Sequence, residues 1–473
     1  MAAWLALWPG GPVAASEAVN RAVNAGVRSA KRSCGDLGVH VVDVASGRTV
    51  YEYDADRERI LASNTKLFTA AAALDRLGPG HFFETEVLLR GEVESGVLTG
   101  DLAVIGGGDP SISGRFHQGD AFAVFREWAD ELARRGIRRV RGDLVMVHGL
   151  FDDAVVHPDW PRDQLAKWYE APVAALSFSD SCARVKIWPD GRPGAPAQVA
   201  GLPRVPFFDV EVTARTTSSS SNHRVGVTRQ PEGDRLTVWG AVYRGARPVE
   251  TWVAVADPVR YFGLALRQAL EEEGIRVDGD VTVTAELPAA EWRRLVVHRS
   301  DLLSALEVVN KRSQNFYAES VLKLLGARSC GRGSWEAGLE VVAEFLERVG
   351  LGRGTYRMAD GSGMSRNNRF SARQVTTLLA EMVQHRYAVE FLRTLPYSGE
   401  EGRSWERRLA EDPYRGNVFA KTGRLRAVSA LSGYAKAASG RLYAFSVLCN
   451  GAKGDWGAKA GQDEIVKAIV RNG

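Results

Sequence analysis

Apolar and polar residues alternate in two short segments near the start of the chain. Residues 38–44 and 49–53 both show this alternation, and Ala45-Ser46-Gly47 lies between them. Alternation with a period of two is typical of β-strands, and a short connection that contains glycine favours a hairpin. Residues 64–77 are instead apolar on nearly every side and are followed by Gly78-Pro79-Gly80. They predict a helix that is buried in a core and ends at the glycine and proline.

The pattern changes between residues 86 and 295, where short valine-rich stretches are separated by glycine and proline. These stretches predict a mostly β region, with helices near residues 121–135 and 259–273 covering its sheets. Beyond residue 300 the helical period returns, and the chain ends in further strands and an amphipathic helix. The helices are predicted at 302–325, 335–349 and 459–471, and the strands at 418–422, 428–434 and 442–449.

These elements favour an α+β fold in which one antiparallel sheet is flanked by helices. A chain of 473 residues exceeds what a single core usually covers, so we expect two or three domains. We predict a main domain from residues 17–85 and 296–473. Residues 86–295 would be a β-rich insertion made of two smaller nested domains.

The charge pattern argues against a nucleic-acid partner. The formal net charge is only +4, and most Lys and Arg residues are interleaved with Asp and Glu. Binding to a phosphate backbone requires denser basic patches than this.

The first 16 residues are apolar and end in small residues, as a secretory leader does, but they lack its positively charged start. They are either a truncated leader or the result of a misplaced start codon. No later stretch reaches the roughly 18 apolar residues of a membrane span. We therefore expect an exported protein of the periplasm or cell envelope that is not an integral membrane protein.

Metal and cofactor chemistry find no support in the sequence. The four cysteines, at positions 34, 182, 330 and 449, form no Cys-x-x-Cys pair, and the histidines form no His-Glu-x-x-His motif. We expect neither a metal nor a cofactor. Four cysteines allow three pairings, but their scatter favours buried free thiols.

The sharpest chemical signal is Ser63-Asn64-Thr65-Lys66, at the predicted start of the core helix. Residues three apart lie on one helical face, so the Lys66 amine can sit beside the Ser63 hydroxyl. The helix N-terminus adds partial positive charge and free N–H groups there. Serine is a weak nucleophile until a base removes its proton, and lysine can be that base only if its pKa is lowered by burial or by a neighbouring cation.

Two more triplets provide the groups that this chemistry needs. Lys421-Thr422-Gly423, on a predicted strand, would supply the second cation. Ser313-Gln314-Asn315, near the middle of a predicted helical stretch, offers a hydroxyl to relay protons and an amide to hold a substrate. The combination of Ser-x-x-Lys, Ser-x-Asn and Lys-Thr-Gly occurs in penicillin-binding proteins and class A β-lactamases.

Each triplet alone is a weak signal. A second Ser-x-x-Lys spans residues 320–323, and further Ser-x-Asn triplets begin at Ser220 and Ser365. Only Ser63 begins a core helix, and a motif at Ser320 would follow the Ser-x-Asn triplet in the wrong order. The alternative for Ser63 and Lys66 is a helix-capping serine beside an exposed lysine.

The chain resembles the class C low-molecular-mass penicillin-binding proteins, a family of D-alanyl-D-alanine carboxypeptidases and endopeptidases. The likeness covers nearly the whole chain from about residue 36. The stretches that carry it are Ala-Ser-Asn-Thr-Lys-Leu (62–67), Gly-Gly-Gly-Asp-Pro (106–110), Ala-Leu-Ser-Phe (175–178), Asn-Lys-Arg-Ser-Gln-Asn-Phe-Tyr-Ala-Glu (310–319) and Asp-Gly-Ser-Gly-Met-Ser-Arg (360–366).

The resemblance implies a penicillin-binding domain of the β-lactamase-like transpeptidase fold, split by inserted domains. The 250 residues between Ser63 and Ser313 provide room for them. It also implies action on peptidoglycan stem peptides and acylation by β-lactam antibiotics.

Carried over residue by residue, the resemblance makes Ser63 the acylated nucleophile and Lys66 its base. Ser313 would relay a proton to the leaving D-alanine, and Asn315 would bind a substrate amide. Lys421 and Thr422 would bind the terminal carboxylate, with Gly423 and Arg424 beside it. The expected oxyanion hole consists of the backbone N–H groups of Ser63 and Arg424.

Two residues depart from the family's pattern. Gln314 stands where an aspartate is usual, which should be tolerated because the flanking serine and asparagine perform the chemistry. Arg424 follows the Lys-Thr-Gly triplet where a small hydroxyl residue is common. Its positive charge would tighten binding of a free C-terminus or change which cross-link fits.

Two alternative functions remain at this point. The same scaffold could be a β-lactamase or esterase, although no glutamate can be assigned as a dedicated deacylating base. It could also be a catalytically silent cell-wall-binding protein, which would have no need of a paired Ser63 and Lys66.

The resemblance also bears on the cysteines. If the terminal strands pair as the resembled fold implies, Cys34 and Cys449 would be close enough for a disulfide.

Overall fold

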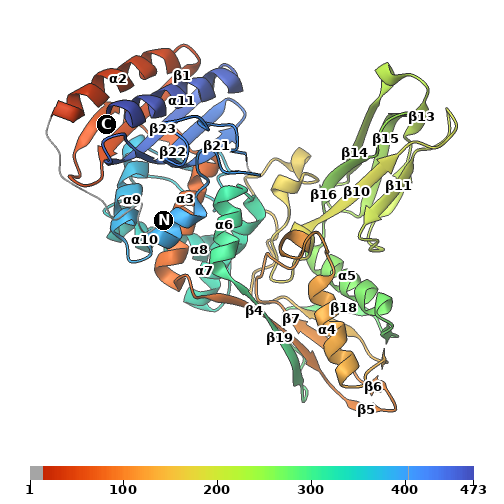
Figure 1. Cartoon of the computed structure of the whole chain (residues 1–473). Helices are drawn as coiled ribbons and strands as arrows, with labels where there is room; N and C mark the ends of the chain where they lie inside the picture. The colour runs from red at the N-terminus through yellow and green to blue at the C-terminus, as the bar shows by residue number, and fades with distance from the viewer. Residues whose placement is uncertain (1–13, 403) are drawn as a thin grey trace. The chain divides into compact units, whose positions relative to one another are not determined.

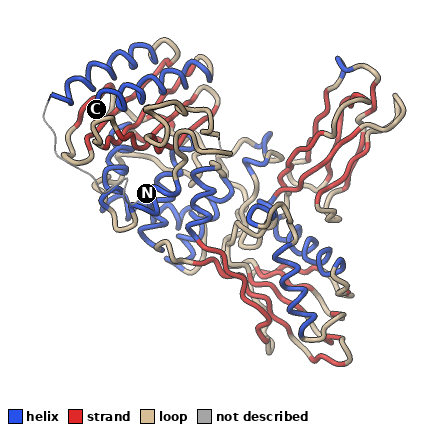
Figure 2. Tube along the Cα trace, viewed as in Figure 1, coloured by secondary structure: helices blue, strands red, loops and turns tan. Residues whose placement is uncertain are grey.

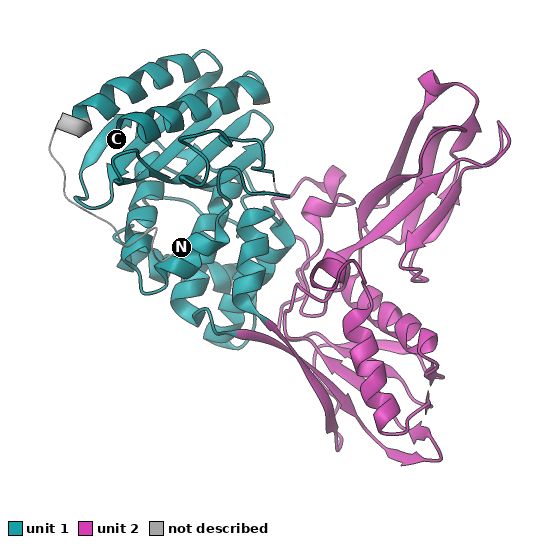
Figure 3. Cartoon of the chain, in the orientation of Figure 1, with its two compact units in different colours: residues 1–81, 301–473 teal, residues 82–300 magenta. Residues whose placement is uncertain are grey.

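The computed structural model describes residues 14–402 and 404–473. The chain divides into two compact units, one of residues 1–81 and 301–473 and the other of residues 82–300 (Figure 3). Of the leader predicted over residues 1–16, residues 1–13 lie outside the described part of the chain. Residues 14–16 belong to helix α2 (Ala14–Ala30). In the part of the chain that is described, no helix has the length and hydropathy needed to cross a bilayer.

A five-stranded antiparallel sheet forms the centre of the first unit, in the order β2-β1-β23-β22-β21. The strands are β1 (Cys34–Asp43), β2 (Thr49–Tyr53), β21 (Val418–Leu425), β22 (Val428–Lys436) and β23 (Leu442–Ala452). Strands β22 and β23 are buried along most of their length, because helices cover both faces of the sheet. The predicted α+β fold with an antiparallel sheet flanked by helices is therefore confirmed.

One face of this sheet is covered by α2 and α11 (Asp455–Asn472), as Figure 1 shows. Val23 of α2 and Ile469 of α11 join the sheet residues Val41 and Val447 in one buried cluster. The remaining helices of the unit lie on the other side of the sheet (Figure 2). They are α3 (Thr65–Leu77), α6 (Leu302–Lys311), α7 (Asn315–Cys330), α8 (Trp335–Arg348), α9 (Ala372–Gln384) and α10 (Ala388–Thr394). As the sequence predicted, α3 is buried on nearly every side.

The single helix predicted over residues 302–325 is wrong. The structure has two helices, α6 and α7, because Ser313 adopts a φ of 55° between them. A left-handed residue cannot continue a right-handed helix, and neither glycine nor proline marks the break. Consequently Ser313 lies in a sharp turn and Asn315 begins a helix, whereas the sequence suggested that both lay inside one.

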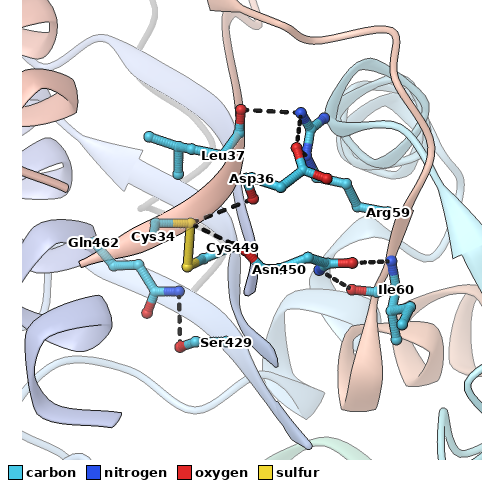
Figure 4. Close-up of a disulfide and its surroundings, with 9 residues drawn as sticks. All are labelled: Cys34, Asp36, Leu37, Arg59, Ile60, Ser429, Cys449, Asn450 and Gln462. Carbon is cyan, nitrogen blue, oxygen red and sulfur yellow. Dashed lines mark hydrogen bonds and ion pairs between the residues drawn. A yellow bond between two sulfur atoms is a disulfide. The ribbon is translucent and has the colours of Figure 1, made fainter. Parts of the chain in front are cut away.

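Cys34 and Cys449 form a disulfide between β1 and β23, with their Cα atoms 5.7 Å apart (Figure 4). This confirms the pairing that the resemblance implied and corrects the expectation of free thiols at these two positions. Cys182 is a buried free thiol and Cys330 an exposed one.

The sheet beside the disulfide also holds the segment that leads to Ser63. The amide of Asn450 on β23 donates to the Ile60 carbonyl at 3.1 Å and accepts from the Ile60 N–H at 3.0 Å. Arg59 is fully buried and donates to Asp36 on β1 at 2.9 Å (Figure 4). These bonds fix the chain at three and four residues before Ser63 to the centre of the sheet.

The second unit has four sheets and two principal helices, α4 (Ala123–Arg134) and α5 (Pro258–Glu272), among the described residues. The first pair consists of a five-stranded and a four-stranded sheet. The five-stranded sheet contains β4 (Phe82–Leu89), β7 (Leu102–Ile105), β9 (Leu144–Val147), β18 (Val281–Thr284) and β19 (Arg293–Asp301). The four-stranded sheet contains β5 (Glu92–Glu94), β6 (Val97–Thr99), β8 (Arg139–Val140) and β17 (Arg276–Val277). The second pair consists of a three-stranded and a four-stranded sheet. The three-stranded sheet contains β10 (Cys182–Trp188), β11 (Gln198–Leu202) and β16 (Val249–Ala254). The four-stranded sheet contains β12 (Asp209–Val212), β13 (Arg215–Thr217), β14 (Arg224–Arg229) and β15 (Arg235–Tyr243). The first pair packs with a large buried cluster that includes Phe125 and Phe262 and with a smaller one that includes Ala103 and Val145. The second pair encloses a cluster that includes Val185 and Val238.

Candidate active site

Ser63 lies in a single 3₁₀ turn, Ala62–Asn64, that leads directly into α3. The preceding Ala62 is buried and has a φ of 48°, a strained conformation for a residue with a side chain. The Ser63 side chain is half-buried, and Lys66 Nζ donates to its Oγ at 3.1 Å. The sequence prediction that helical spacing would bring these two groups together is therefore confirmed.

Lys66 is fully buried and has two further partners, both of them acceptors. Nζ donates to Asn315 Oδ1 at 2.6 Å and to the Ser362 carbonyl at 2.6 Å. Burial lowers the pKa of Lys66 to about 7, although the carboxylates of Glu319 and Asp360 oppose this shift. A neutral amine has two N–H groups and one lone pair. With both N–H groups given to Asn315 and Ser362, the lone pair of the neutral amine is left for Ser63, so the 3.1 Å hydrogen bond then runs from the Ser63 hydroxyl to Nζ.

Ser313 and Lys421 form the second pair of the site. Lys421 Nζ donates to Ser313 Oγ at 2.7 Å and to the Thr422 carbonyl at 2.8 Å. Burial lowers the pKa of Lys421 well below its usual value, and the positive charge of Lys66 lowers it further. The sequence analysis named burial or a neighbouring cation as the cause of a lowered pKa at Lys66. Burial is the cause found there, and the effect of a neighbouring cation falls on Lys421 instead.

Strand β21 lies at the edge of the sheet and passes close to the turn that carries Ser63. A Cβ on Gly423 would come within 2.5 Å of the Leu61 carbonyl oxygen and 3.2 Å of the Asn64 nitrogen. Glycine is needed there, because any side chain would push the strand away from the turn. Thr422 is half-buried and Arg424 is exposed.

The loop of residues 360–365 also contributes to the site, although its glycine-rich sequence was equally consistent with a purely structural turn. It supplies the Ser362 carbonyl that accepts from Lys66, and the hydroxyl of Thr69 donates to its Gly361 carbonyl at 2.8 Å. Gly363 has a φ of 83°, and a Cβ there would lie 1.9 Å from the Ala62 carbonyl oxygen. The glycines of this loop therefore allow it to approach the turn that carries Ser63.

Sequence reasoning missed the role of two groups near Lys66, the Ser362 carbonyl and the buried carboxylate of Glu319. A backbone carbonyl leaves no signal in a sequence. Glu319 did leave one, because it is the acidic residue of a helix that is buried on all sides along Asn315–Ala327. A charged group in such a helix needs a buried partner.

The chain is similar to known carboxypeptidases. The D-Ala-D-Ala carboxypeptidase 3 (S13) family matches residues 22–471. A D-alanyl-D-alanine carboxypeptidase from Actinomadura sp. strain R39 is 35% identical over 417 residues, which cover 84% of this chain and 74% of the relative. The D-alanyl-D-alanine carboxypeptidase DacB of Haemophilus influenzae is 26% identical over 84% of this chain and 82% of the relative.

Solved structures support the fold. The crystal structure of penicillin binding protein 4 from Haemophilus influenzae superposes with a TM-score of 0.81 at 24% identity, covering 94% of this chain and 97% of that one. A second structure of that protein, in complex with a β-lactam, gives a TM-score of 0.77 at the same identity, covering 95% and 99%. The family model matches almost the whole chain, and the chain is 35% identical to a relative of which it covers 74%. The chain therefore belongs to the D-Ala-D-Ala carboxypeptidase 3 (S13) family.

Proposed function

We propose that this protein is a serine-type D-Ala-D-Ala carboxypeptidase/endopeptidase that acts on peptidoglycan stem peptides through an acyl-enzyme on Ser63. The observation that carries the proposal is the environment of Lys66, a buried amine held 3.1 Å from a serine hydroxyl with both of its other hydrogen bonds directed to acceptors. Family membership supports the choice of substrate.

Acylation begins when Lys66 takes the hydroxyl proton of Ser63. Oγ then attacks the carbonyl carbon of the penultimate D-alanine, and the carbonyl oxygen becomes an oxyanion. The N–H groups of Ser63 and Arg424 are the donors proposed for this oxyanion, and loss of one such donor costs on the order of a hundredfold in rate or more. When the peptide C–N bond breaks, the leaving amine of D-alanine receives a proton through Ser313.

Lys421 has two roles in this scheme. Its hydrogen bond to Ser313 Oγ holds the proton relay in place. With Thr422 it also binds the terminal carboxylate of the substrate. The arrival of that negative charge stabilises the ammonium form of Lys421, whose pKa burial otherwise lowers. Binding of a free C-terminus thereby charges the lysine that recognises it.

Deacylation repeats these steps with water in place of the amine. Water attacks the acyl carbonyl, its proton passes to the basic amine of the site, and Ser63 leaves with a proton restored to Oγ. β-Lactams would follow the same first step, because opening of their ring leaves the same ester on Ser63. We expect that adduct to persist, since the leaving amine stays tethered to it.

We further propose that the protein acts outside the cytoplasmic membrane, in the periplasm or cell envelope. The disulfide between Cys34 and Cys449 supports this, since such bonds persist in oxidising compartments. We also propose that the insertion predicted over residues 86–295 consists of two nested domains. The cluster with Val185 and Val238, which is separate from the one with Phe125 and Phe262, supports that division.

Two measurements on the intact protein test the proposed function. The first is release of free D-alanine from a peptide that ends in D-Ala-D-Ala. The second is intact mass and peptide mapping after exposure to benzylpenicillin, which should locate one stable penicilloyl group on the peptide containing Ser63. Rapid loss of that adduct would indicate a β-lactamase, and absence of both adduct and D-alanine release would indicate a silent cell-wall-binding protein.

A further inference from the structure

Glu319 lies one helical turn beyond Asn315 on α7 and is fully buried. Its Oε1 accepts from the Ser362 N–H at 2.7 Å. Its Oε2 accepts from the Gly361 N–H at 2.9 Å and from Trp335 Nε1 at 2.9 Å. All of these partners are donors, which suits an ionised carboxylate that can only accept.

The two backbone bonds place Glu319 directly behind the base. The residue whose N–H it receives, Ser362, is the one whose carbonyl accepts from Lys66 Nζ at 2.6 Å. On the same helix, Asn315 provides the other acceptor for Lys66. One face of α7 therefore positions both acceptors of Lys66: it carries Asn315 itself, and through Glu319 it holds Ser362.

A second buried carboxylate, Asp360, holds the rest of this loop. It accepts from the Gly363 N–H at 2.7 Å, the Ser365 N–H at 2.6 Å and Asn368 Nδ2 at 2.8 Å. The Ser362 N–H, which comes just before these amides in the chain, donates to Glu319 instead. The two carboxylates therefore have separate tasks.

Glu319 interacts electrostatically with Lys66 on α3 and with Asp360 on the loop. Lys323 follows one turn later on α7, and Lys421 on β21 acts on Lys66. Nζ of Lys323 lies 3.9 Å from the ring centroid of Trp335, which donates to Glu319. Burial and the charge of Asp360 raise the pKa of Glu319 to about 7, while its donors oppose that rise. The negative charge of Glu319 in turn raises the pKa of Lys66 against the effect of burial.

We propose that Glu319 is a positioning residue for the general base: it fixes the Ser362 carbonyl, and that carbonyl with Asn315 holds the two N–H groups of neutral Lys66 so that its lone pair faces Ser63. This inference rests on the proposed roles of Ser63 and Lys66. Glu319 itself touches neither substrate nor the reacting oxygen. Its effect passes through one backbone carbonyl and through its charge.

The test is the rate of acylation by a chromogenic β-lactam, measured from pH 5 to 9 on the full chain. Glu319→Gln replaces one carboxylate oxygen by an NH₂ group, so the side chain can no longer accept from both the Gly361 and the Ser362 N–H. We expect the plateau rate to fall about 10- to 100-fold, as for a general base held out of position. Loss of the negative charge removes an interaction that raises the pKa of Lys66. The acid limb of the profile should therefore move to lower pH by about half a unit or more.

Glu319→Asp separates position from charge. It keeps the carboxylate but withdraws it by one methylene, so the plateau should fall while the acid limb stays near its wild-type pH. Asp43→Asn is the matched control, because Asp43 is also a buried carboxylate of the first unit that accepts from two backbone N–H groups, those of Ala45 and Ser46. It should lower the melting temperature and leave the pH profile unchanged.

Each outcome decides. A folded Glu319→Gln protein with the wild-type plateau and midpoint overturns the inference, as does a loss of melting temperature like that of Asp43→Asn with an unmoved profile. If Glu319→Gln does not fold, Glu319→Asp decides, and a wild-type plateau in that variant overturns it. If the wild-type protein is not acylated at all, the proposed function fails.

Discussion

Two Ser-x-x-Lys tetrads lie in the same unit of this protein and have different environments. Ser63 sits in a turn before α3, half-buried, with a backbone forced out of helical geometry at Ala62. Ser320 sits inside α7, fully buried, and its hydroxyl donates to the Phe316 carbonyl of its own helix at 2.9 Å. Such a back-bond engages the hydroxyl within its own helix.

The lysines differ in the same way. Lys66 and Lys323 are both fully buried. Lys66 Nζ donates to the serine of its own tetrad and to two acceptors from distant parts of the chain. Lys323 Nζ instead lies over the ring of Trp335, a cation–π contact that helps α7 to pack on α8.

The comparison teaches that the spacing of serine and lysine does not by itself make a nucleophile. What distinguishes Ser63 is its position outside the helix, where the hydroxyl is not taken by a helical carbonyl, and the two acceptors that hold Lys66 beside it. Four predictions could break or sharpen this distinction.

The largest effect is expected from the serines themselves. Ser63→Ala should reduce labelling by fluorescent penicillin to background, because the atom that forms the ester is gone. Ser320→Ala should retain labelling close to that of the wild type. Gel fluorescence at matched concentrations of folded protein measures both, and label on the Ser320 peptide would break the comparison.

The lysines should differ in the kind of effect as well as its size. Lys66→Gln removes the base, so the acylation rate should fall by about a thousandfold, within the range of general-base catalysis. Lys323→Gln removes a buried cation–π contact and should chiefly lower stability, by about 2 kcal/mol. Stopped-flow acylation and thermal melts distinguish the two, and a thousandfold rate loss in a folded Lys323→Gln protein would contradict the assignment.

The pH dependence should follow Lys66 alone. Its pKa is lowered to about 7, and only the neutral amine can accept the proton of Ser63. Acylation should therefore fall about tenfold for each pH unit below 7 and level off above it. Lys323→Gln should keep that midpoint, and a wild-type rate that is constant from pH 5 to 8 would remove Lys66 as the base.

Much of the fold was predictable because its signals are local. The alternation over residues 38–44 and the all-round apolar pattern of residues 64–77 predicted β1 and α3 directly. The break at Ser313 was not predictable, because the turn there depends on tertiary contacts and has no glycine or proline to announce it. The disulfide could be proposed only through the resemblance, since pairing depends on which strands become neighbours.

In the site too, local spacing was predictable from the sequence, and contacts between distant segments were not. Ser63 and Lys66 could be paired by helical spacing, whereas the grouping of Ser313, Asn315 and Lys421 with them came from the family likeness. The chemistry requires a lowered pKa at Lys66, but the burial that lowers it exists only in the folded chain. The roles of Ser362 and Glu319 depend on backbone atoms and on contacts between distant segments.

The smallest effect is expected at Arg424. It is exposed and directly follows Gly423 on the edge strand that passes the turn of Ser63. An exposed charge near a bound carboxylate is worth up to about 1 kcal/mol, so Arg424→Ser should raise KM for a D-Ala-D-Ala peptide by about two- to fivefold with little change in kcat. Because salt screens such a charge, the difference between the two proteins should shrink between about 50 mM and about 500 mM salt. Equal KM and kcat at low salt would show that Arg424 does not contribute to recognition of the C-terminus, and the distinction between the tetrads would then rest on the buried groups alone.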